Sequence, residues 1–306
     1  MDVITGLKPP PSLPKNTIVT IGNFDGVHLG HQKILLFLVD QAKKRNLYSL
    51  VLTFSPHPEE ILSKGKIVMI QTLAQRLKTI ENFGVHGVLI TPFDEQFSNL
   101  SSKGFIQKIL LNSLKAKEIV IGDNFRFGKN REGDINALQA LASRLGFEAH
   151  KIPSVIEGGK IVSSSLIRRS LLEGEIEEVN TLLGRCYEIK GKVIKGKARG
   201  KVLGFPTANI EAKNDIIPFG VYISQVRINS ETLPAITNAG LRPTFDKEEM
   251  QIESYIINFN RNLYGEEIDI KFIKKIRDEM KFKSPEELSL QISKDLEQAK
   301  TYFKLI

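Results

Sequence analysis

The sequence contains no tryptophan, one cysteine and five histidines among its 306 residues. A single cysteine excludes a disulfide framework within the chain and leaves too few thiols for a metal centre built from cysteines. No histidine or aspartate cluster surrounds Cys186 in the sequence, so we interpret it as a packing thiol without a chemical role.

Long apolar runs are absent as well. No stretch approaches the roughly eighteen consecutive apolar residues that a membrane-spanning helix needs. The N-terminus carries Lys8 and three prolines at positions 9 to 11, where a signal peptide would have an apolar core. We therefore expect a cytoplasmic protein with no membrane partner.

Length and charge set further bounds. A chain of 306 residues is long for one hydrophobic core, so two domains are expected. The net charge of +8 suits either nucleic acid or small anionic substrates such as ATP. Aromatic residues are not interleaved with the basic clusters as they are in single-strand binders, but charge by itself does not decide between these partners.

The most informative stretch is residues 21–32, which join a short apolar strand predicted at 17–21 to a helix predicted at 34–44. Glycines in this turn allow unusual backbone angles and leave room for a ligand against the main chain. The free N–H groups at the start of the following helix favour an anion there. The glycines are Gly22, Gly26 and Gly30.

Two histidines stand at the mouth of that helix. His28 and His31 are three residues apart, so both imidazoles can face one phosphate and stabilise the charge that it gains during transfer. A partial metal site is the alternative, but a closed zinc site needs about four ligands and no third histidine lies nearby in the sequence. The pattern therefore favours nucleotide binding.

The rest of the first half alternates between strand and helix patterns, which predicts a parallel, doubly wound sheet. In such a sheet, ligands bind at the carboxyl ends of the strands. The predicted strands are 47–54, 87–91, 118–121 and 148–152, and the predicted helices are 72–83, 102–114, 138–145 and 175–183. Because Gly184 stops the last helix, we place a domain boundary there.

Loops at that edge carry further candidates. Prolines in residues 55–58 exclude a helix there and predict a rigid loop, which makes Phe54 and His57 candidate ligand contacts; a purely structural loop is the alternative. The loop 122–134 combines aromatic and cationic side chains, which suits a flat ring and a phosphate, with a flexible hairpin as the alternative.

A run of serines at 163–165 opens a predicted helix. Such serines can cap the helix or hold a phosphate, and Arg168 adds a fork of donors for a leaving pyrophosphate.

After residue 187, short β-branched runs separated by turns predict a small barrel. The predicted strands are 188–194, 221–228, 233–238, 252–259 and 267–276. A terminal helix follows, with Ser284 as its cap, Pro285 in its first turn and Glu287 completing a capping box. Its core-facing stripe is Ile292, Leu296, Ala299 and Phe303.

Two stretches of the second half suggest phosphate chemistry. Residues 191–198 nearly match a P-loop, but Ala198 stands where a magnesium-binding hydroxyl is required, so we reject that reading. In residues 204–210, the Thr207 hydroxyl and the Asn209 carbonyl are hard oxygens two residues apart that can face one Mg²⁺ in an extended chain. A side-chain turn is the alternative there.

These motifs resemble a known family. His28-Leu29-Gly30-His31 is similar to the nucleotidyltransferase signature, and residues 22–28 resemble the FMN adenylyltransferase module of bacterial FAD synthetase. Pro206-Thr207-Ala208-Asn209 is similar to the riboflavin kinase signature, and that resemblance extends through 238–245 and 263–265 to the terminal helix. The chain is thus similar to the bacterial bifunctional riboflavin kinase/FMN adenylyltransferases.

The resemblance implies a Rossmann-like nucleotidyltransferase domain with a parallel sheet at 1–184 and a riboflavin kinase domain at 185–306, an antiparallel β-barrel with a C-terminal helix. It further implies that ATP phosphorylates riboflavin to FMN and that a second ATP adenylylates FMN to FAD, releasing pyrophosphate. The implied cofactor is Mg²⁺, and the implied partners are riboflavin, FMN and ATP, without nucleic acid. We expect a monomer or a weak homo-oligomer.

The resemblance also assigns site residues. The implied catalytic residues are Asn23, His28, His31, Arg168 and Glu253, with Glu253 as general base, and the implied metal ligands are Thr207 and Asn209. The implied substrate contacts are Gly22, Phe24, Asp25, Gly26, Gly30, Phe54, His57, Asn124, Arg126, Phe127, Ser164, Lys197, Gly204 and Arg242. The sequence departs from the family pattern at Asn124, Ser165, Tyr255, Asn258 and Asn262.

Two other functions fit parts of the pattern. A nucleic-acid-binding protein is one, because tRNA synthetases share the His-x-Gly-His motif. A flavin-binding regulator without catalysis is the other, although the presence of His28, His31 and Glu253 argues against it.

Overall fold

The strand expected at residues 17–21 forms as β2 (Thr17–Ile21), an inner strand of a six-stranded parallel sheet with the order β1-β4-β3-β2-β5-β6. The computed structural model describes residues 1–6, 16–63, 65–196, 204–243 and 248–305, with no side-chain placement at 241–243 and 248–249. These residues form two compact units, Met1–Ser164 and Ser165–Ile306. The other strands of the sheet are β1 (Asp2–Thr5), β3 (Tyr48–Phe54), β4 (Gly87–Thr91), β5 (Ala116–Gly122) and β6 (Glu148–Ile152).

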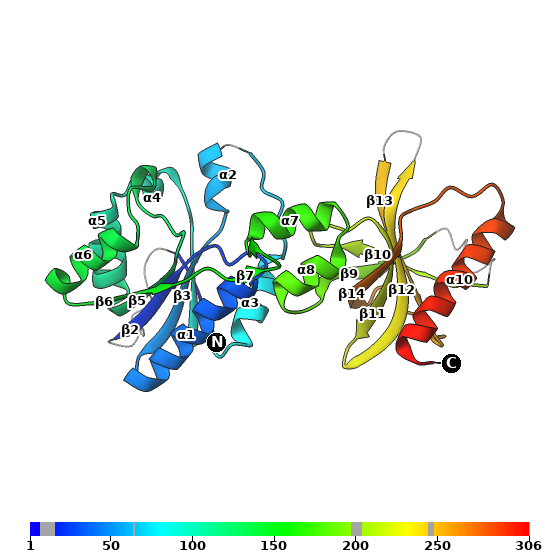
Figure 1. The fold of residues 1–306 in the computed structure, drawn as a ribbon, viewed down its shortest axis with the longest axis horizontal. Helices are drawn as coiled ribbons and strands as arrows, with labels where there is room; N and C mark the ends of the chain where they lie inside the picture. Colours follow the sequence, from blue (N-terminus) through cyan, green and yellow to red (C-terminus); the bar gives the residue numbers. More distant parts are fainter. Residues whose placement is uncertain (7–15, 64, 197–203, 244–247, 306) are drawn as a thin grey trace. The chain divides into compact units, whose positions relative to one another are not determined.

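Helices cover both faces of this sheet (Figure 1). They are α1 (Leu29–Arg45), α2 (Pro58–Ser63), α3 (Leu73–Glu81), α4 (Glu95–Ser98), α5 (Ser102–Gly104), the π-helix η1 (Phe105–Ser113), the 3₁₀ helix η2 (Lys129–Arg131) and α6 (Ile135–Leu145). A two-stranded hairpin, β7 (Ile156–Glu157) and β8 (Lys160–Ile161), follows β6.

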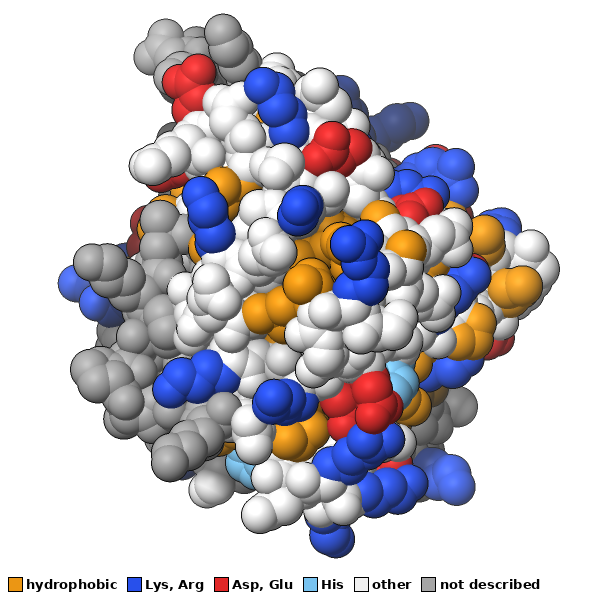
Figure 2. Space-filling model, turned by 90° about the vertical axis from the view of Figure 1, so that its left-hand side faces the viewer, with side chains coloured by type: hydrophobic (Ala, Val, Ile, Leu, Met, Phe, Trp, Pro, Cys, Tyr) orange, Lys and Arg blue, Asp and Glu red, His pale blue; other side chains and the backbone are white. Residues whose placement is uncertain are grey.

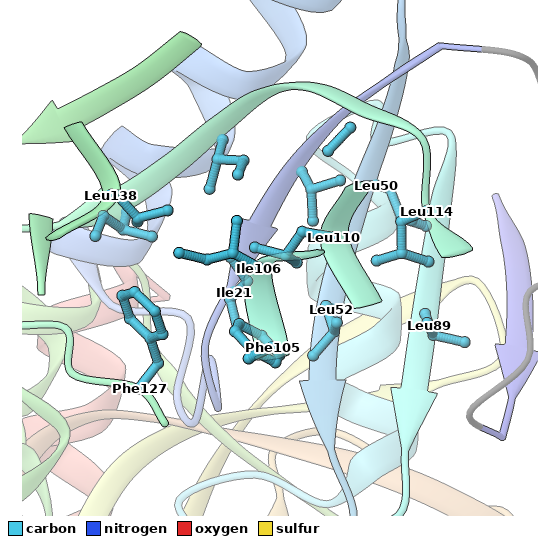
Figure 3. Close-up of a cluster of buried hydrophobic side chains, with 14 of the residues drawn as sticks. Ile21, Leu50, Leu52, Leu89, Phe105, Ile106, Leu110, Leu114, Phe127 and Leu138 are labelled. Carbon is cyan, nitrogen blue, oxygen red and sulfur yellow. The ribbon is translucent and has the colours of Figure 1, made fainter. Parts of the chain in front are cut away.

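The two faces of the sheet carry separate hydrophobic cores because side chains of a strand alternate in direction. On β2, Ile18 packs with side chains of α1 and α3, whereas Val19 and Ile21 pack with side chains of η1 and α6. Figure 3 shows the second cluster, in which Phe105 and Leu110 lie against the strands. Both faces of the strand are buried, so it reads as a continuous apolar run, as expected for a parallel sheet.

The strand order defines where a ligand fits. The chain runs from β2 to β3 and β4 on one side and then crosses to β5 on the other side of β2. In open α/β sheets, the crevice at such a reversal, outside the carboxyl ends of the strands, is the usual ligand site. The loops that follow β2 and β5 therefore flank this reversal point.

The second unit contains a closed antiparallel barrel with the order β10-β13-β12-β11-β14-β9. Its strands are β9 (Tyr187–Ile194), β10 (Ala208–Ala212), β11 (Gly220–Ile228), β12 (Glu231–Pro243), β13 (Glu248–Ile256) and β14 (Glu267–Arg277). The parallel sheet and the barrel confirm the expected fold class. Residues 191–194 lie within β9, in agreement with the rejection of a P-loop.

Helices α7 (Ser164–Leu172) and α8 (Ile176–Leu183) belong almost entirely to the second unit. The Asn180 side chain on α8 donates to the carbonyl of Phe272 at 2.9 Å and accepts from the Tyr187 amide at 2.7 Å. These bonds attach the helix to β14 and β9. The structural division at residue 164 therefore precedes the boundary predicted at Gly184, although Gly184 does end α8 in the left-handed conformation (φ 65°).

Several elements were not predicted. β1, β10, α2, α4, η2 and the β7–β8 hairpin are short, and they lack the periodicity on which sequence assignment depends. The prediction that prolines exclude a helix at 55–58 is wrong at its last residue, because Pro58 begins α2. Proline is well tolerated at the first helical position, where its missing N–H would have no partner within the helix.

The C-terminal helix α10 (Pro285–Phe303) begins as predicted, with the Ser284 hydroxyl accepting from the Glu287 amide at 3.3 Å. The reciprocal bond is displaced by one residue, because the Glu287 carboxylate accepts from the Lys283 amide at 2.9 Å. Of the expected apolar stripe, Leu296, Ala299 and Phe303 pack against the barrel strands.

The surface agrees with the composition. On the face that Figure 2 shows, Lys and Arg side chains are spread among uncharged and acidic ones. No helix in the described part of the chain is both long and apolar enough to span a bilayer.

A buried ion pair attaches α10 to the barrel, and we expect its loss to destabilise the second unit. Arg277 on β14 donates to the Asp295 carboxylate at 2.8 Å, and Asp295 is 2% exposed and also accepts from Gln291. Asp295→Ala leaves a guanidinium without its partner and should lower the free energy of unfolding by about 2–4 kcal/mol. Glu297→Ala on the same helix removes an exposed pair with Lys300 and should cost less than about 1 kcal/mol.

Urea unfolding followed by tyrosine fluorescence measures this effect, because every tyrosine except Tyr48 lies after residue 164. Equal midpoints for the two variants would show that the ion pair does not hold the helix.

Candidate active sites

The loop after β2 has an unusual backbone that buried side chains hold in place. Phe24, Gly26 and Val27 have φ of 52°, 79° and 40°. A positive φ is unfavourable for phenylalanine and valine, but both side chains are buried in the core and so anchor the loop. The Phe24 ring therefore supports this loop from within the hydrophobic core.

Asp25 fastens the same loop to two other segments. Its carboxylate is 1% exposed and accepts from the amides of Ile70, at 3.1 Å for each oxygen, and Gln71, at 3.3 Å. Its carbonyl accepts from the Ser164 hydroxyl at 2.9 Å. A buried carboxylate is tolerated where several N–H groups satisfy it, so Asp25 also serves the framework of the site.

Arg76 is a buried residue of this loop's surroundings that the sequence analysis did not select. Its guanidinium is 3% exposed and donates to the carbonyl of Asn23 at 2.7 Å and to that of Phe54 at 3.5 Å. Burial lowers the pKa of Arg76, and the nearby Asp25 opposes that shift. The cation therefore ties the ends of β2 and β3 together. The sequence signal for this role was a basic residue among the apolar residues of the helix predicted at 72–83.

His28 and His31 lie together at the start of α1. His28 is the N-cap residue, and its Nδ1 accepts from the His31 amide at 3.4 Å. The two rings stack with centroids 3.7 Å apart and 17° between their planes. A side chain at Gly30 would lie 3.1 Å from His28 Cε1, so glycine makes room for this ring. The helix N-terminus and two imidazoles therefore form one polar face that suits an anion.

Asn23 contacts a second predicted residue. Its Nδ2 lies 2.7 Å from His57 Nε2, and His57 Nδ1 accepts from the Glu59 amide at 3.2 Å. This contact joins the loop after β2 to the loop after β3. Gly22 also meets β3, because its amide donates to the carbonyl of Leu52 at 3.1 Å.

The phenylalanines predicted to contact a ligand are buried. Phe54 packs edge-on against Phe93 and Phe97, and Phe127 packs on Phe105 and Phe125, with Phe54 and Phe127 each 7% exposed. Both rings therefore belong to the core beneath the ligand edge.

The polar neighbours in the loop after β5 are exposed. The Asn124 side chain contacts the Ser154 hydroxyl at 3.4 Å, and Arg126 donates to the carbonyl of Phe125 at 3.2 Å. On α7, Ser164 and Arg168 are four residues apart and so lie on the same helix face.

The barrel brings a second group of predicted residues together. Asn209 on β10 pairs in register with Glu253 on β13. Gln251 lies between their side chains: its Nε2 is 2.9 Å from Asn209 Oδ1 and 2.6 Å from Glu253 Oε1. Sequence analysis did not select Gln251, although its place two residues before Glu253 puts it on the same strand face.

The other residues predicted for the barrel site have fewer described contacts. A Cβ at Gly196 would overlap the Asn209 side-chain amide, so glycine allows the two to meet. Gly204 is exposed with φ of 84°, and Thr207 is half-buried just before β10. Arg242 lies on β12, where only its backbone is described, and Lys197 lies outside the described residues, as do Thr244 and Phe245 of the predicted motif.

The donor atoms at the barrel site fit a hard cation. The side-chain oxygens of Thr207, Asn209 and Glu253 come from hydroxyl, amide and carboxylate groups, which Mg²⁺ prefers over nitrogen or sulfur. The close approach of Gly196 keeps the Asn209 amide within the site.

A cluster at the opposite edge of the parallel sheet has a different character. Glu118, Glu148 and His150 have side-chain atoms within 4.8 Å of one another. Arg45 contacts both carboxylates, at 3.2 Å and 2.6 Å, and His150 Nε2 lies 2.8 Å from Glu118. Since one guanidinium already pairs with both carboxylates, we interpret this cluster as a structural ion network.

The chain matches two family models in sequence order. The model described as FAD synthetase matches residues 11–166, and the one described as riboflavin kinase matches residues 183–303.

Relatives match across nearly the whole chain. The bifunctional riboflavin kinase/FMN adenylyltransferase of Buchnera aphidicola from Schizaphis graminum is 40% identical, covering 100% of both chains, and that of Escherichia coli K12 is 36% identical, covering 94% of this chain and 93% of the relative. A solved structure titled a macrolide-efflux protein, from Streptococcus pneumoniae, has a TM-score of 0.90 and 29% identity, covering 98% of this chain and 99% of that one. With both family models in order and curated relatives matched from end to end, the chain belongs to the bifunctional riboflavin kinase/FMN adenylyltransferase family.

Proposed function

We propose that this chain makes FAD in two steps, phosphorylating riboflavin with ATP and then adenylylating the FMN product with a second ATP. The observation that carries this proposal is the presence of two distinct polar sites in one chain. One is the stacked His28–His31 pair at a helix N-terminus, and the other is the Asn209–Gln251–Glu253 group in the barrel.

We assign FMN adenylylation to residues 1–184 and riboflavin phosphorylation to residues 185–306. The family matches support this division, because one ends at residue 166 and the other begins at residue 183. Helices α7 and α8 lie between these limits in sequence.

In adenylyl transfer, a phosphate oxygen of FMN forms a bond to the α-phosphorus of ATP while the bond from that phosphorus to the bridging oxygen breaks. Pyrophosphate leaves, so the step needs no protein nucleophile. His28, His31 and the N-terminus of α1 would stabilise the charge on the α-phosphate. Asn23, held by His57 and Arg76, would orient a substrate, and Arg168 would bind the pyrophosphate.

In phosphoryl transfer, Glu253 would accept the proton of the ribityl 5′-hydroxyl as its oxygen bonds to the γ-phosphorus and ADP leaves. Thr207 and Asn209 would hold Mg²⁺, which when bound neutralises charge on the phosphate oxygens. The remaining chain residues would fix the hydroxyl against the nucleotide, which lowers the entropy cost of bringing the two together.

The predicted substrate contacts fall into two groups. Phe24, Asp25, Phe54 and Phe127 have buried framework contacts, so we propose that they shape the adenylyltransferase site from behind. Direct substrate contacts in the adenylyltransferase site would come from Gly22, Gly26, Gly30, His57, Asn124, Arg126 and Ser164, and those in the kinase site from Lys197, Gly204 and Arg242.

We also propose a cytoplasmic enzyme that acts on small molecules without a nucleic-acid or membrane partner, as a monomer or weak homo-oligomer. Sedimentation of the purified protein with and without RNA would test the oligomeric state and the absence of RNA binding.

Separate variants should abolish separate steps. The double change His28→Ala and His31→Ala removes both imidazoles from the anion site and should slow FAD formation roughly 10²-fold or more, so that FMN accumulates from riboflavin. Glu253→Gln keeps the shape but removes the base, so it should slow FMN formation by roughly 10²–10⁴-fold while supplied FMN is still converted to FAD. Chromatography of the flavins measures both steps.

Each variant serves as the control for the other, because its unaffected activity shows that the chain is folded. If either variant lost both activities while its near-UV circular dichroism stayed unchanged, the assignment of one step to each half would be wrong.

A second prediction concerns the close approach at Gly196. In Gly196→Ala, the added Cβ overlaps the Asn209 amide, so the amide must move or the backbone must shift. We expect riboflavin kinase activity to fall at least roughly 10-fold, because misplacing a site group by about 1 Å can cost that much or more. Conversion of supplied FMN to FAD in the same sample should stay at the wild-type rate. An unchanged kinase rate would mean that the Asn209 position is not critical.

A further inference from the structure

Gln251 contacts two side chains that the proposed kinase mechanism needs. Its Nε2 lies 2.9 Å from Asn209 Oδ1 and 2.6 Å from Glu253 Oε1. The two acceptors belong to residues that are register partners on neighbouring strands, so they lie side by side on one face of the barrel sheet. One amide group therefore joins the proposed metal ligand to the proposed base.

The chemistry of the contact explains why an amide suits this position. An amide carbonyl and a carboxylate are both acceptors, so they repel each other at close range unless a donor lies between them. The NH₂ group of glutamine carries two hydrogens and can donate to both at once. The bond to the carboxylate is charge-assisted and thus stronger than one between neutral groups.

The surroundings of Asn209 restrict it further. Asn209 is 8% exposed, and the backbone at Gly196 leaves no room for a Cβ next to its amide. Gln251 donates to its oxygen from another direction. The side chain is therefore confined on two sides, and removal of the Gln251 donor would release one of them.

We propose that Gln251 is a positioning residue of the phosphoryl-transfer site, holding the Asn209 oxygen and the Glu253 carboxylate in a fixed mutual orientation. This inference rests on the proposed kinase function of the barrel. Gln251 acts through its two neighbours, so it affects the catalytic step more than the binding of riboflavin.

The test compares wild-type protein with Gln251→Met, which keeps the length of the side chain but removes both donors. Kinase rates are measured against riboflavin and Mg²⁺. We expect kcat to fall roughly 10–10²-fold with KM for riboflavin changed less than about threefold. The Mg²⁺ concentration for half-maximal rate should rise, because the Asn209 oxygen loses the donor that holds it in place.

Two controls separate positioning from a general loss of structure. Gln225→Met changes a half-buried glutamine on β11 and should leave the kinase parameters unchanged. Adding Gln251→Met to Glu253→Gln should cause a much smaller loss than it does in the wild-type background, because residues acting as a unit are not additive. Should Gln251→Met fail to fold, Gln251→Ser removes the same donors and leaves space for water.

The outcomes are distinct. A wild-type kcat and a wild-type Mg²⁺ dependence in Gln251→Met, or full additivity with Glu253→Gln, would overturn this inference and leave the proposed function standing. A wild-type protein that forms no FMN from riboflavin and magnesium ATP would overturn the proposed function and, with it, the role of Gln251.

Discussion

A buried carboxylate and a buried guanidinium hold the loop at the reversal point of the parallel sheet. Asp25 is 1% exposed and Arg76 is 3% exposed, and both bind backbone groups: Asp25 the amides at 70 and 71, Arg76 the carbonyls of Asn23 and Phe54. A charge in the interior is stable only when hydrogen bonds replace its lost hydration. These buried hydrogen bonds therefore hold the loop that carries the histidines in one conformation.

That constraint explains how this loop tolerates backbone strain. Phe24 and Val27 adopt positive φ angles, which local energetics disfavour. Their burial offsets the cost, and each fully buried apolar side chain of this size contributes roughly 1.5–3 kcal/mol. The N–H groups at the start of α1 and the two imidazoles therefore lie on a rigid loop, as a site for a developing charge requires.

The parallel-sheet unit and the barrel unit position their polar groups in different ways. The parallel sheet collects loops from several strands at one edge, and a helix dipole supplies part of the field. The barrel instead uses the pairing of neighbouring strands, which brings Asn209 opposite Glu253 without any loop. Because strand register is set by the backbone hydrogen bonds, the separation of those side chains depends little on loop motion.

Many elements were predictable from sequence because each is dictated by local side-chain pattern. Strands 17–21, 87–91 and 148–152 form at the predicted residues, and α10 begins at its predicted cap. The short helix α2 was not predicted, because six residues carry too little helical period, and the segment of β10 was interpreted only as part of the motif at 204–210. Motifs likewise identified His28, His31 and Glu253 by their resemblance to a family.

By itself, then, the sequence determined the two fold classes, their order and the motifs that bear chemistry, since these depend on residue type and spacing along the chain. Only the tertiary structure decided that Phe24 and Asp25 support the loop from inside, that Arg76 ties two strand ends, and that Gln251 bridges Asn209 and Glu253. Each of those roles depends on at least one contact between residues far apart in the chain, and burial and register exist only once the chain has folded.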